Sequence, residues 1–120
     1  MMRRARQLSS QPVDPDLAFR ARMQRDRERL IELSATLRRP TAWPRAAGRL
    51  AAIEHVAHGL AGAGGVFGFT DLGEDAARLE RLLEGWRKQP PVEISPRRIA
   101  ALDRRLAPVL ERLRCAADPS

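Results

Sequence analysis

Hydrophobic residues recur every three or four positions along most of the chain, and no segment alternates strictly between apolar and polar side chains. Spacing of three or four gives a helix one apolar face, whereas an exposed strand needs a period of two. The pattern therefore predicts an all-α protein. Four helices are expected: over about 14–39, from 44 to the glycines at 62–68, over 70–88, and from 95 to about 116.

Signals for helix ends support these boundaries. Asp14 and Ser95 each precede a proline, which favours the first helical position. Thr70 with Asp71 gives a further start signal, and Gln89-Pro90-Pro91 ends the third helix. Short connections between amphipathic helices favour an up-and-down antiparallel four-helix bundle. Trp43 and Trp86 are expected to cover the ends of the bundle. The residues expected in its core are Phe19, Met23, Leu30, Leu33, Leu37, Leu50, Ile53, Ala57, Leu60, Gly64, Leu72, Ala76, Leu79, Leu82, Leu83, Ile99, Leu102, Leu106, Val109 or Leu110, and Leu113.

The length of 120 residues fits one domain, expected over 14–116 between a flexible basic tail at 1–13 and a frayed end at 117–120. The net charge is +7, and the whole excess lies in residues 1–50, where twelve arginines accompany five acidic residues. Residues 51–120 balance at zero. Because no aromatic side chains are interleaved with the basic run, nucleic-acid binding is not expected, and the arginines are interpreted as a solvated face.

No apolar stretch is long enough to cross a bilayer, and the basic start of the chain lacks the apolar segment of a secretory signal. The single cysteine, Cys115, cannot form an intramolecular disulfide, which is typical of a reducing compartment. These features predict a cytoplasmic protein that makes no contact with a membrane.

The second helix contains four glycines between positions 59 and 65, each of which costs a helix about 1 kcal/mol relative to alanine. At about 100° per residue, Gly64 falls on the core face, whereas Gly62 and Gly65 fall outside it. Close packing therefore explains Gly64 and leaves the other two without a structural reason. A function of the exposed face is indicated.

A histidine stands on that face. His58 lies about 120° from the centre of the core face, and its helical neighbours Gly62, Gly65 and Ala51 are all small. His55 points almost directly away from the core. An imidazole on such a bare patch would be accessible to the active site of another protein, because no long side chain blocks the approach.

This stretch resembles the signature of histidine-containing phosphotransfer (HPt) domains, the four-helix-bundle carriers of bacterial phosphorelays. The resemblance covers residues 53–80 and extends loosely over 15–114 through the number and order of the helices. One position departs from the pattern, because Ala61 stands where the family usually has lysine. The matching residues are His58, Leu60, Gly62, Ala63, Gly65 and Gly68, followed by Leu72, Ala76, Leu79 and Glu80.

The resemblance implies that His58 is the phosphoacceptor and exchanges a phosphoryl group with the aspartate of response-regulator receiver domains. Receiver domains and hybrid histidine kinases are then the expected partners, and the protein is a stoichiometric carrier rather than a turnover enzyme. Mg²⁺ is expected on the receiver, with no cofactor bound by this chain. Gly68 would terminate the helix. The implied docking surface consists of His55, Gly59, Ala61, Gly62 and Gly65.

Two other functions stay open. The same bundle could dock a kinase or receiver without accepting phosphate, a hypothesis that Ala61 favours. Alternatively, residues 1–49 could form a basic helical adaptor for an anionic partner. A metal site is not expected, because Glu54 and the distant Cys115 are poor candidates to complete a ligand set with His55 and His58.

Overall fold

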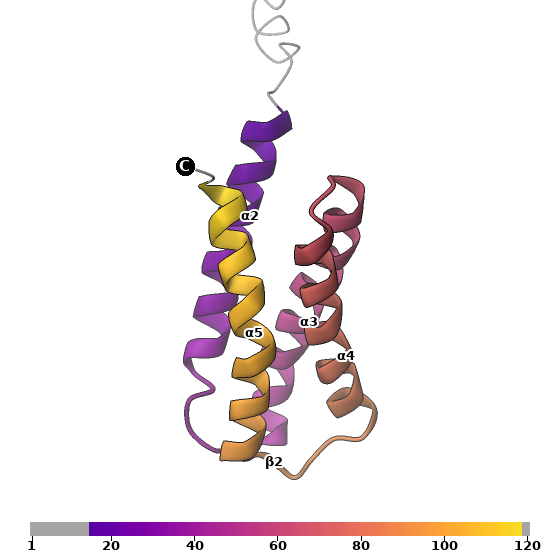
Figure 1. Ribbon diagram of the computed structural model, residues 1–120. Helices are drawn as coiled ribbons and strands as arrows, with labels where there is room; N and C mark the ends of the chain where they lie inside the picture. The colour runs from indigo at the N-terminus through magenta and orange to yellow at the C-terminus, as the bar shows by residue number, and fades with distance from the viewer. Residues whose placement is uncertain (1–14, 119–120) are drawn as a thin grey trace, which may run out of the picture.

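The computed structural model describes residues 15–118. It contains four helices, α2 (Pro15–Ala35), α3 (Trp43–Val66), α4 (Thr70–Lys88) and α5 (Pro96–Ala117). Consecutive helices run antiparallel, with α3 and α4 packed most closely against each other, so the predicted up-and-down four-helix bundle is confirmed (Figure 1). The tail expected at 1–13 lies outside the described residues, as do the last two of the residues expected to fray at 117–120.

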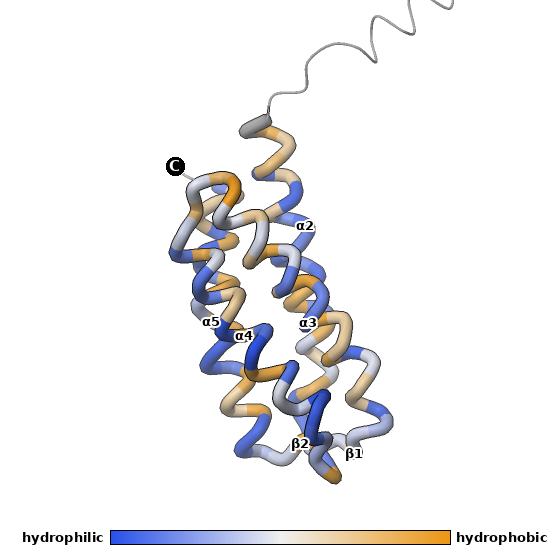
Figure 2. The backbone as a smooth tube through the Cα atoms, turned by 90° about the vertical axis from the view of Figure 1, so that its right-hand side faces the viewer, coloured by the Kyte–Doolittle hydropathy of each residue, from blue (hydrophilic) through white to orange (hydrophobic). Residues whose placement is uncertain are grey.

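All four helices contribute to a single apolar core, and hydrophobic and hydrophilic residues are interspersed along each helix (Figure 2). The predicted apolar stripes lie largely inside it, with Met23, Ile53, Leu79 and Leu113 fully buried. Ile94, which no stripe included, is also fully buried and plugs one end of the core. In the described part of the chain, no helix is long and apolar enough to span a membrane.

The first helix is shorter than expected, because α2 ends at Ala35 rather than near residue 39. The chain leaves it through a turn in which the amide of Leu37 donates to the carbonyl of Ser34 over 3.0 Å. Pro40 disfavours helical geometry at Arg39, which gives a physical reason why the helix does not extend to that residue. Leu37 still reaches the core and is only 2% exposed.

The bundle also contains two short strands, which the hydrophobic pattern does not indicate. β1 (Thr41–Ala42) and β2 (Glu93–Ile94) pair antiparallel, with Thr41 opposite Ile94. They join the α2–α3 link to the α4–α5 link at the lower end of the bundle (Figure 1). Strands of two residues are too short to show a period, so the hydrophobic pattern could not reveal them.

The residue that caps the start of α5 is the one that the sequence predicts, whereas the residue that caps α4 differs from the prediction. Ser95 caps α5 by accepting a hydrogen bond from the amide of Arg98 at 3.3 Å, and Pro96 occupies the first turn, as predicted. In α4 the capping position belongs to Phe69, which offers no side-chain cap, and Thr70 is already helical. The prediction that Thr70 and Asp71 form the cap is therefore wrong by one residue.

Candidate functional site

Helix α3 runs without a break through its glycines, and one of them is needed for packing. A Cβ atom on Gly64 would lie 2.7 Å from the backbone of Gly73 on α4 and 2.8 Å from the carbonyl oxygen of Phe69. A Cβ on Gly73 would in turn lie 3.2 Å from the carbonyl oxygen of Ala61. The backbones of α3 and α4 therefore touch here, and this contact fixes how the two helices align.

The turn between α3 and α4 is built on Gly68, whose φ of +80° lies in the left-handed region that favours glycine. The amide of Phe69 reaches back to the carbonyl of Gly64 over 2.8 Å, which is the closing bond of a Schellman motif. Gly68 thus ends α3 as the resemblance implies. The hairpin it creates places residues of α4 beside the residues that precede Gly68 on α3.

His58 projects from the outer face of α3, and 74% of its side chain is exposed. The nearby Gly62 and Gly65 are exposed as well, and a Cβ added to either would meet nothing within 4 Å. His55 is also exposed, one turn before His58. The structure thus confirms the exposure that the helical geometry predicted for these four residues.

The other two residues of the expected docking surface lie partly inside the molecule. Ala61 is half-buried and packs against the core on the α4 side of α3. Gly59 is half-buried against α2, where the position of its absent Cβ lies 3.3 Å from Nη2 of Arg22. The open patch around His58 is therefore bounded by α4 on one side and by α2 on the other.

A carboxylate on α4 holds the imidazole of His58. Nδ1 lies 2.6 Å from Oε2 of Glu80, whose side chain is 23% exposed. A carboxylate can only accept, so Nδ1 of the neutral ring carries the proton and donates it to Glu80. The lone pair of the neutral ring is then on Nε2, which has no hydrogen-bond partner among the described residues. This tautomer gives His58 a nucleophilic nitrogen that faces solvent.

A second pair lies one turn before His58. Nε and Nη2 of Arg87 donate to the carboxylate of Glu54 at 3.1–3.2 Å, which is bidentate geometry. The hydrogen bond with Glu54 raises the pKa of Arg87 above its ordinary value. A shallow hollow of about 300 Å³ connects the two pairs, and its lining consists of Ala51, Glu54, His55, His58, Glu80 and Arg87.

The sequence identified His58, but it revealed neither of the two ion pairs at this site, His58 with Glu80 and Arg87 with Glu54. Glu80 entered only as part of the family pattern, and Arg87 was not singled out at all. One signal was available: Gly68 lies ten residues after His58 and twelve before Glu80, so a hairpin turning at Gly68 brings both to a similar height. The contact itself also needs the rotation of α4 about its axis, which the Gly64–Gly73 contact sets.

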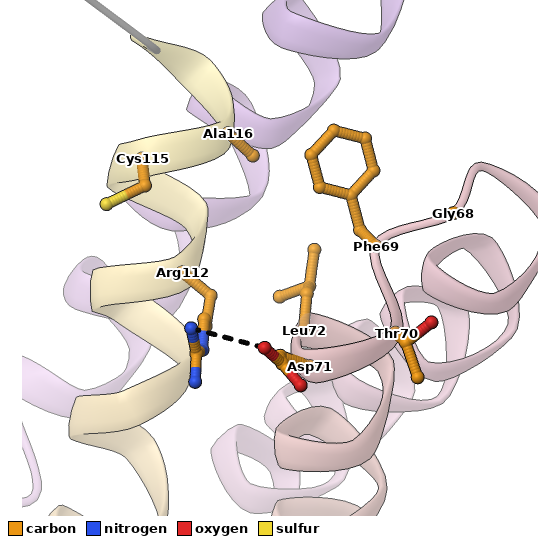
Figure 3. A pocket seen from close by; sticks show the side chains of 8 residues that line it. All are labelled: Gly68, Phe69, Thr70, Asp71, Leu72, Arg112, Cys115 and Ala116. Atoms are coloured by element: carbon orange, nitrogen blue, oxygen red, sulfur yellow. Dashed lines mark ion pairs between the residues drawn. The ribbon is translucent and has the colours of Figure 1, made fainter.

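Another hollow lies where the α3–α4 turn approaches the end of α5 (Figure 3). It measures about 320 Å³, and Arg112 and Asp71 form an ion pair of 3.6 Å at its edge. Cys115 on its rim is an exposed free thiol. The hollow contains no histidine, and Arg112 is engaged by Asp71 and Asp75. Within residues 17–118, no three histidine, cysteine or acidic side chains gather as a metal-binding group.

Fold and site together define a class of protein: a four-helix bundle that presents one oriented histidine from the middle of a helix hairpin. A family model described as the Hpt domain matches residues 17–114, and the chain belongs to this family. Members of the family are phosphocarriers of phosphorelay signalling rather than enzymes. A search of curated proteins and a search of solved structures each returned no match.

Proposed function

We propose that His58 accepts a phosphoryl group from the phospho-aspartate of a response-regulator receiver domain and can return it. The observation that carries this proposal is the side chain of His58, exposed on a bare patch and held through Nδ1 by Glu80. A neutral imidazole is a good nucleophile near neutral pH. No other described histidine has a carboxylate partner of this kind.

The transfer is a single displacement at phosphorus. The lone pair of Nε2 forms the new N–P bond while the bond from phosphorus to the aspartate oxygen breaks, and the aspartate leaves as a carboxylate. The proton stays on Nδ1, so positive charge develops on the ring. Glu80 stabilises that charge through the bond already present. Transfer back to an aspartate follows the same steps in reverse.

This chain has little further chemistry to perform, because phosphoryl transfer depends mainly on positioning and on stabilising charge. The receiver is expected to bring Mg²⁺, which would stabilise the negative charge of the phosphoryl group. Both carboxylates that line the hollow at His58 are already paired, Glu80 with His58 and Glu54 with Arg87. This agrees with a metal ion that is held by the receiver and not by this chain. The protein is then consumed and regenerated once per transfer, as a stoichiometric carrier.

The open patch supports docking. Gly62 lies one turn after His58 and Gly65 two turns after it, and both leave the space above the helix free. A receiver must bring its aspartate within bonding distance of Nε2, so side chains near this line of approach would obstruct it. The proposal thereby explains two glycines that packing does not require.

A phosphorylation experiment tests the proposal. Full-length protein mixed with a phosphorylated receiver domain should gain an acid-labile, base-stable phosphate. His58→Gln should abolish this label and leave the melting temperature nearly unchanged, because an exposed side chain contributes little to stability. His55→Gln serves as the control and should label normally. Equal labelling of the His58→Gln variant would contradict the assignment.

A second function remains a candidate because Ala61 supplies no cation beside His58. In this alternative the bundle binds a kinase or receiver without accepting phosphate. Stable binding to a phosphorylated receiver, with the phosphate retained on its aspartate, would favour the alternative over transfer.

A further inference from the structure

Three ion pairs lie at or beside His58, and each has the same orientation. His58 is 74% exposed above Glu80 at 23%, and Arg87 is 55% exposed above Glu54 at 15%. The third pair lies on α2, where Arg22 is 40% exposed and its partner Asp26 is 24% exposed. The basic group thus faces solvent in every pair while the carboxylate lies beneath it. A partner approaching His58 meets the cations first.

The two arginines lie on opposite sides of the acceptor. Arg87 comes from α4 and is bound to Glu54, one turn before His58. Arg22 comes from α2, and its guanidinium lies against α3 beside Gly59, the residue that follows His58. At 100° per residue, Gly59 lies 100° to one side of His58 and Glu54 lies 40° to the other. Gly59, the first of the four glycines in this stretch, leaves room for this guanidinium, because a Cβ there would lie only 3.3 Å from Nη2.

We propose that Arg22 and Arg87 are specificity-determining residues, which select receiver domains whose phosphorylated pocket is rimmed by carboxylates. The inference rests on the proposed function of His58 and names the chemistry of the partner surface. A pocket that holds a phospho-aspartate together with Mg²⁺ needs carboxylates to bind the metal, and it is therefore negative. Complementary charge raises the rate of encounter and disfavours partners of the wrong sign.

A simpler role for the arginines is to neutralise the carboxylates beneath them. The two roles differ in what they predict when a whole pair is removed. If each arginine only compensates its own acid, replacing both members by neutral isosteres leaves transfer unchanged. If the outward charge recruits the partner, the same replacement slows transfer although the net charge of the protein is preserved.

The test uses three full-length variants, each of which removes one ion pair. Glu54→Gln/Arg87→Gln and Asp26→Asn/Arg22→Gln neutralise the pairs beside His58. Glu84→Gln/Lys88→Gln is the matched control for the Arg87 variant, because its cation is also an exposed residue of α4 and its ion pair spans 2.7 Å, yet neither residue lines the hollow at His58 as Glu54 and Arg87 do. All three variants keep the net charge of the wild type.

Each protein is phosphorylated by two donors at low and high ionic strength. The first kind of donor is a set of isolated receiver domains that have been phosphorylated with acetyl phosphate. These domains differ in the number of carboxylates around the phospho-aspartate. The other donor is phosphoramidate, which is too small to contact both arginines. We expect each test variant to lose about fivefold or more in the rate from acidic-rimmed receivers at low salt, and much less at high salt. The control and the phosphoramidate rates should stay within about twofold of the wild type.

Several results would overturn the proposal. Unchanged transfer in both test variants would reduce the arginines to local neutralisation. An equal loss in the Glu84→Gln/Lys88→Gln control, or an equal loss with phosphoramidate, would show that docking is not the affected step. Absence of label on the wild type with either donor would reject the proposed function of His58 itself, an outcome distinct from selective failure of the arginine pairs.

Discussion

Gly64 and Gly65 are neighbours on α3, yet their surroundings differ completely. A Cβ on Gly64 would lie within 2.7 Å of the backbone of α4, whereas a Cβ on Gly65 would meet nothing within 4 Å. The inner glycine lets two helices touch, and the outer one, like Gly62, keeps a surface bare. The composition of a segment therefore does not reveal why its glycines are there. Of two adjacent positions on one helix, Gly64 is required for packing and Gly65 keeps the surface accessible.

The sharpest way to break this comparison is the same substitution at both positions. Gly64→Ala should lower the free energy of unfolding by about 2 kcal/mol or more, because backbone atoms of α4 cannot move aside as a side chain can. Gly65→Ala should raise it by up to about 1 kcal/mol, since alanine favours the helix and finds open space. Urea unfolding measures both. Changes of the same sign would refute the distinction between an inner and an outer glycine.

Glu80 tests a different property of the exposed face of α3. It is expected to affect the reactivity of His58 and not the access of a partner to it. Glu80→Ala removes the acceptor that fixes the proton on Nδ1, so we expect the phosphorylation rate of His58 to fall by about tenfold or more. Phosphoramidate as the donor separates this effect from docking. The melting temperature should change little, because the pair lies at the surface. An unchanged rate would remove Glu80 from the mechanism.

Gly62 tests access directly. Gly62→Gln should leave stability nearly unchanged, because the position is open, but it should slow transfer from a receiver by about tenfold, since the longer side chain obstructs docking. Gly62→Ala should slow transfer less and stabilise the helix by up to about 1 kcal/mol. Melting temperature and transfer rate are measured on the same preparations. A destabilised variant with normal transfer per folded molecule would place Gly62 with Gly64, as a packing residue.

The smallest expected effect lies on the α2 side of the open face, at Asp26. Burial raises the pKa of Asp26 above its ordinary value, and the charge of Arg22 offsets this only in part. The folded state therefore binds the proton of Asp26 more tightly than the unfolded state does, and the stability cost of ionisation grows as the pH rises from the unfolded pKa through the folded pKa. Asp26→Asn should stabilise the protein by less than about 1 kcal/mol at pH 7 and should have no effect at a pH below the unfolded pKa. A pH series of thermal melts measures the difference, and a stabilisation that grows toward acid would have the wrong sign.

Most of the fold could be predicted because its signals are local. Ser95 with Pro96, Gly68 and the apolar stripes each depend on a few neighbouring residues, and the structure has them where the sequence places them. Positions on a helix are equally local, so simple geometry separated Gly64 from Gly62 and Gly65 before any contact was known.

The remaining features depend on residues that meet only in the folded chain. The bridge between Thr41 and Ile94 pairs two links more than fifty residues apart, and neither strand is long enough to carry a pattern. The contact between His58 and Glu80 requires both the height of the α3–α4 hairpin and the rotation of α4. Arg22 beside Gly59 requires the placement of α2 as well. The role of His58 as acceptor stays a prediction until the protein is labelled.

The α3–α4 hairpin also determines where the chain tolerates an added residue. One alanine inserted after Gly68 would shift the numbering of α4 by one, which corresponds to a rotation of about 100° and a rise of about 1.5 Å along the helix. If Gly73 keeps its contact with Gly64, the turn must bulge; if the turn keeps its form, Glu80 moves away from His58. The same insertion between residues 36 and 40 falls in a link remote from that hairpin and should leave phosphorylation of His58 intact. Homologous sequences of different length are therefore expected to vary in the α2–α3 link and to keep the spacing from His58 to Glu80 constant.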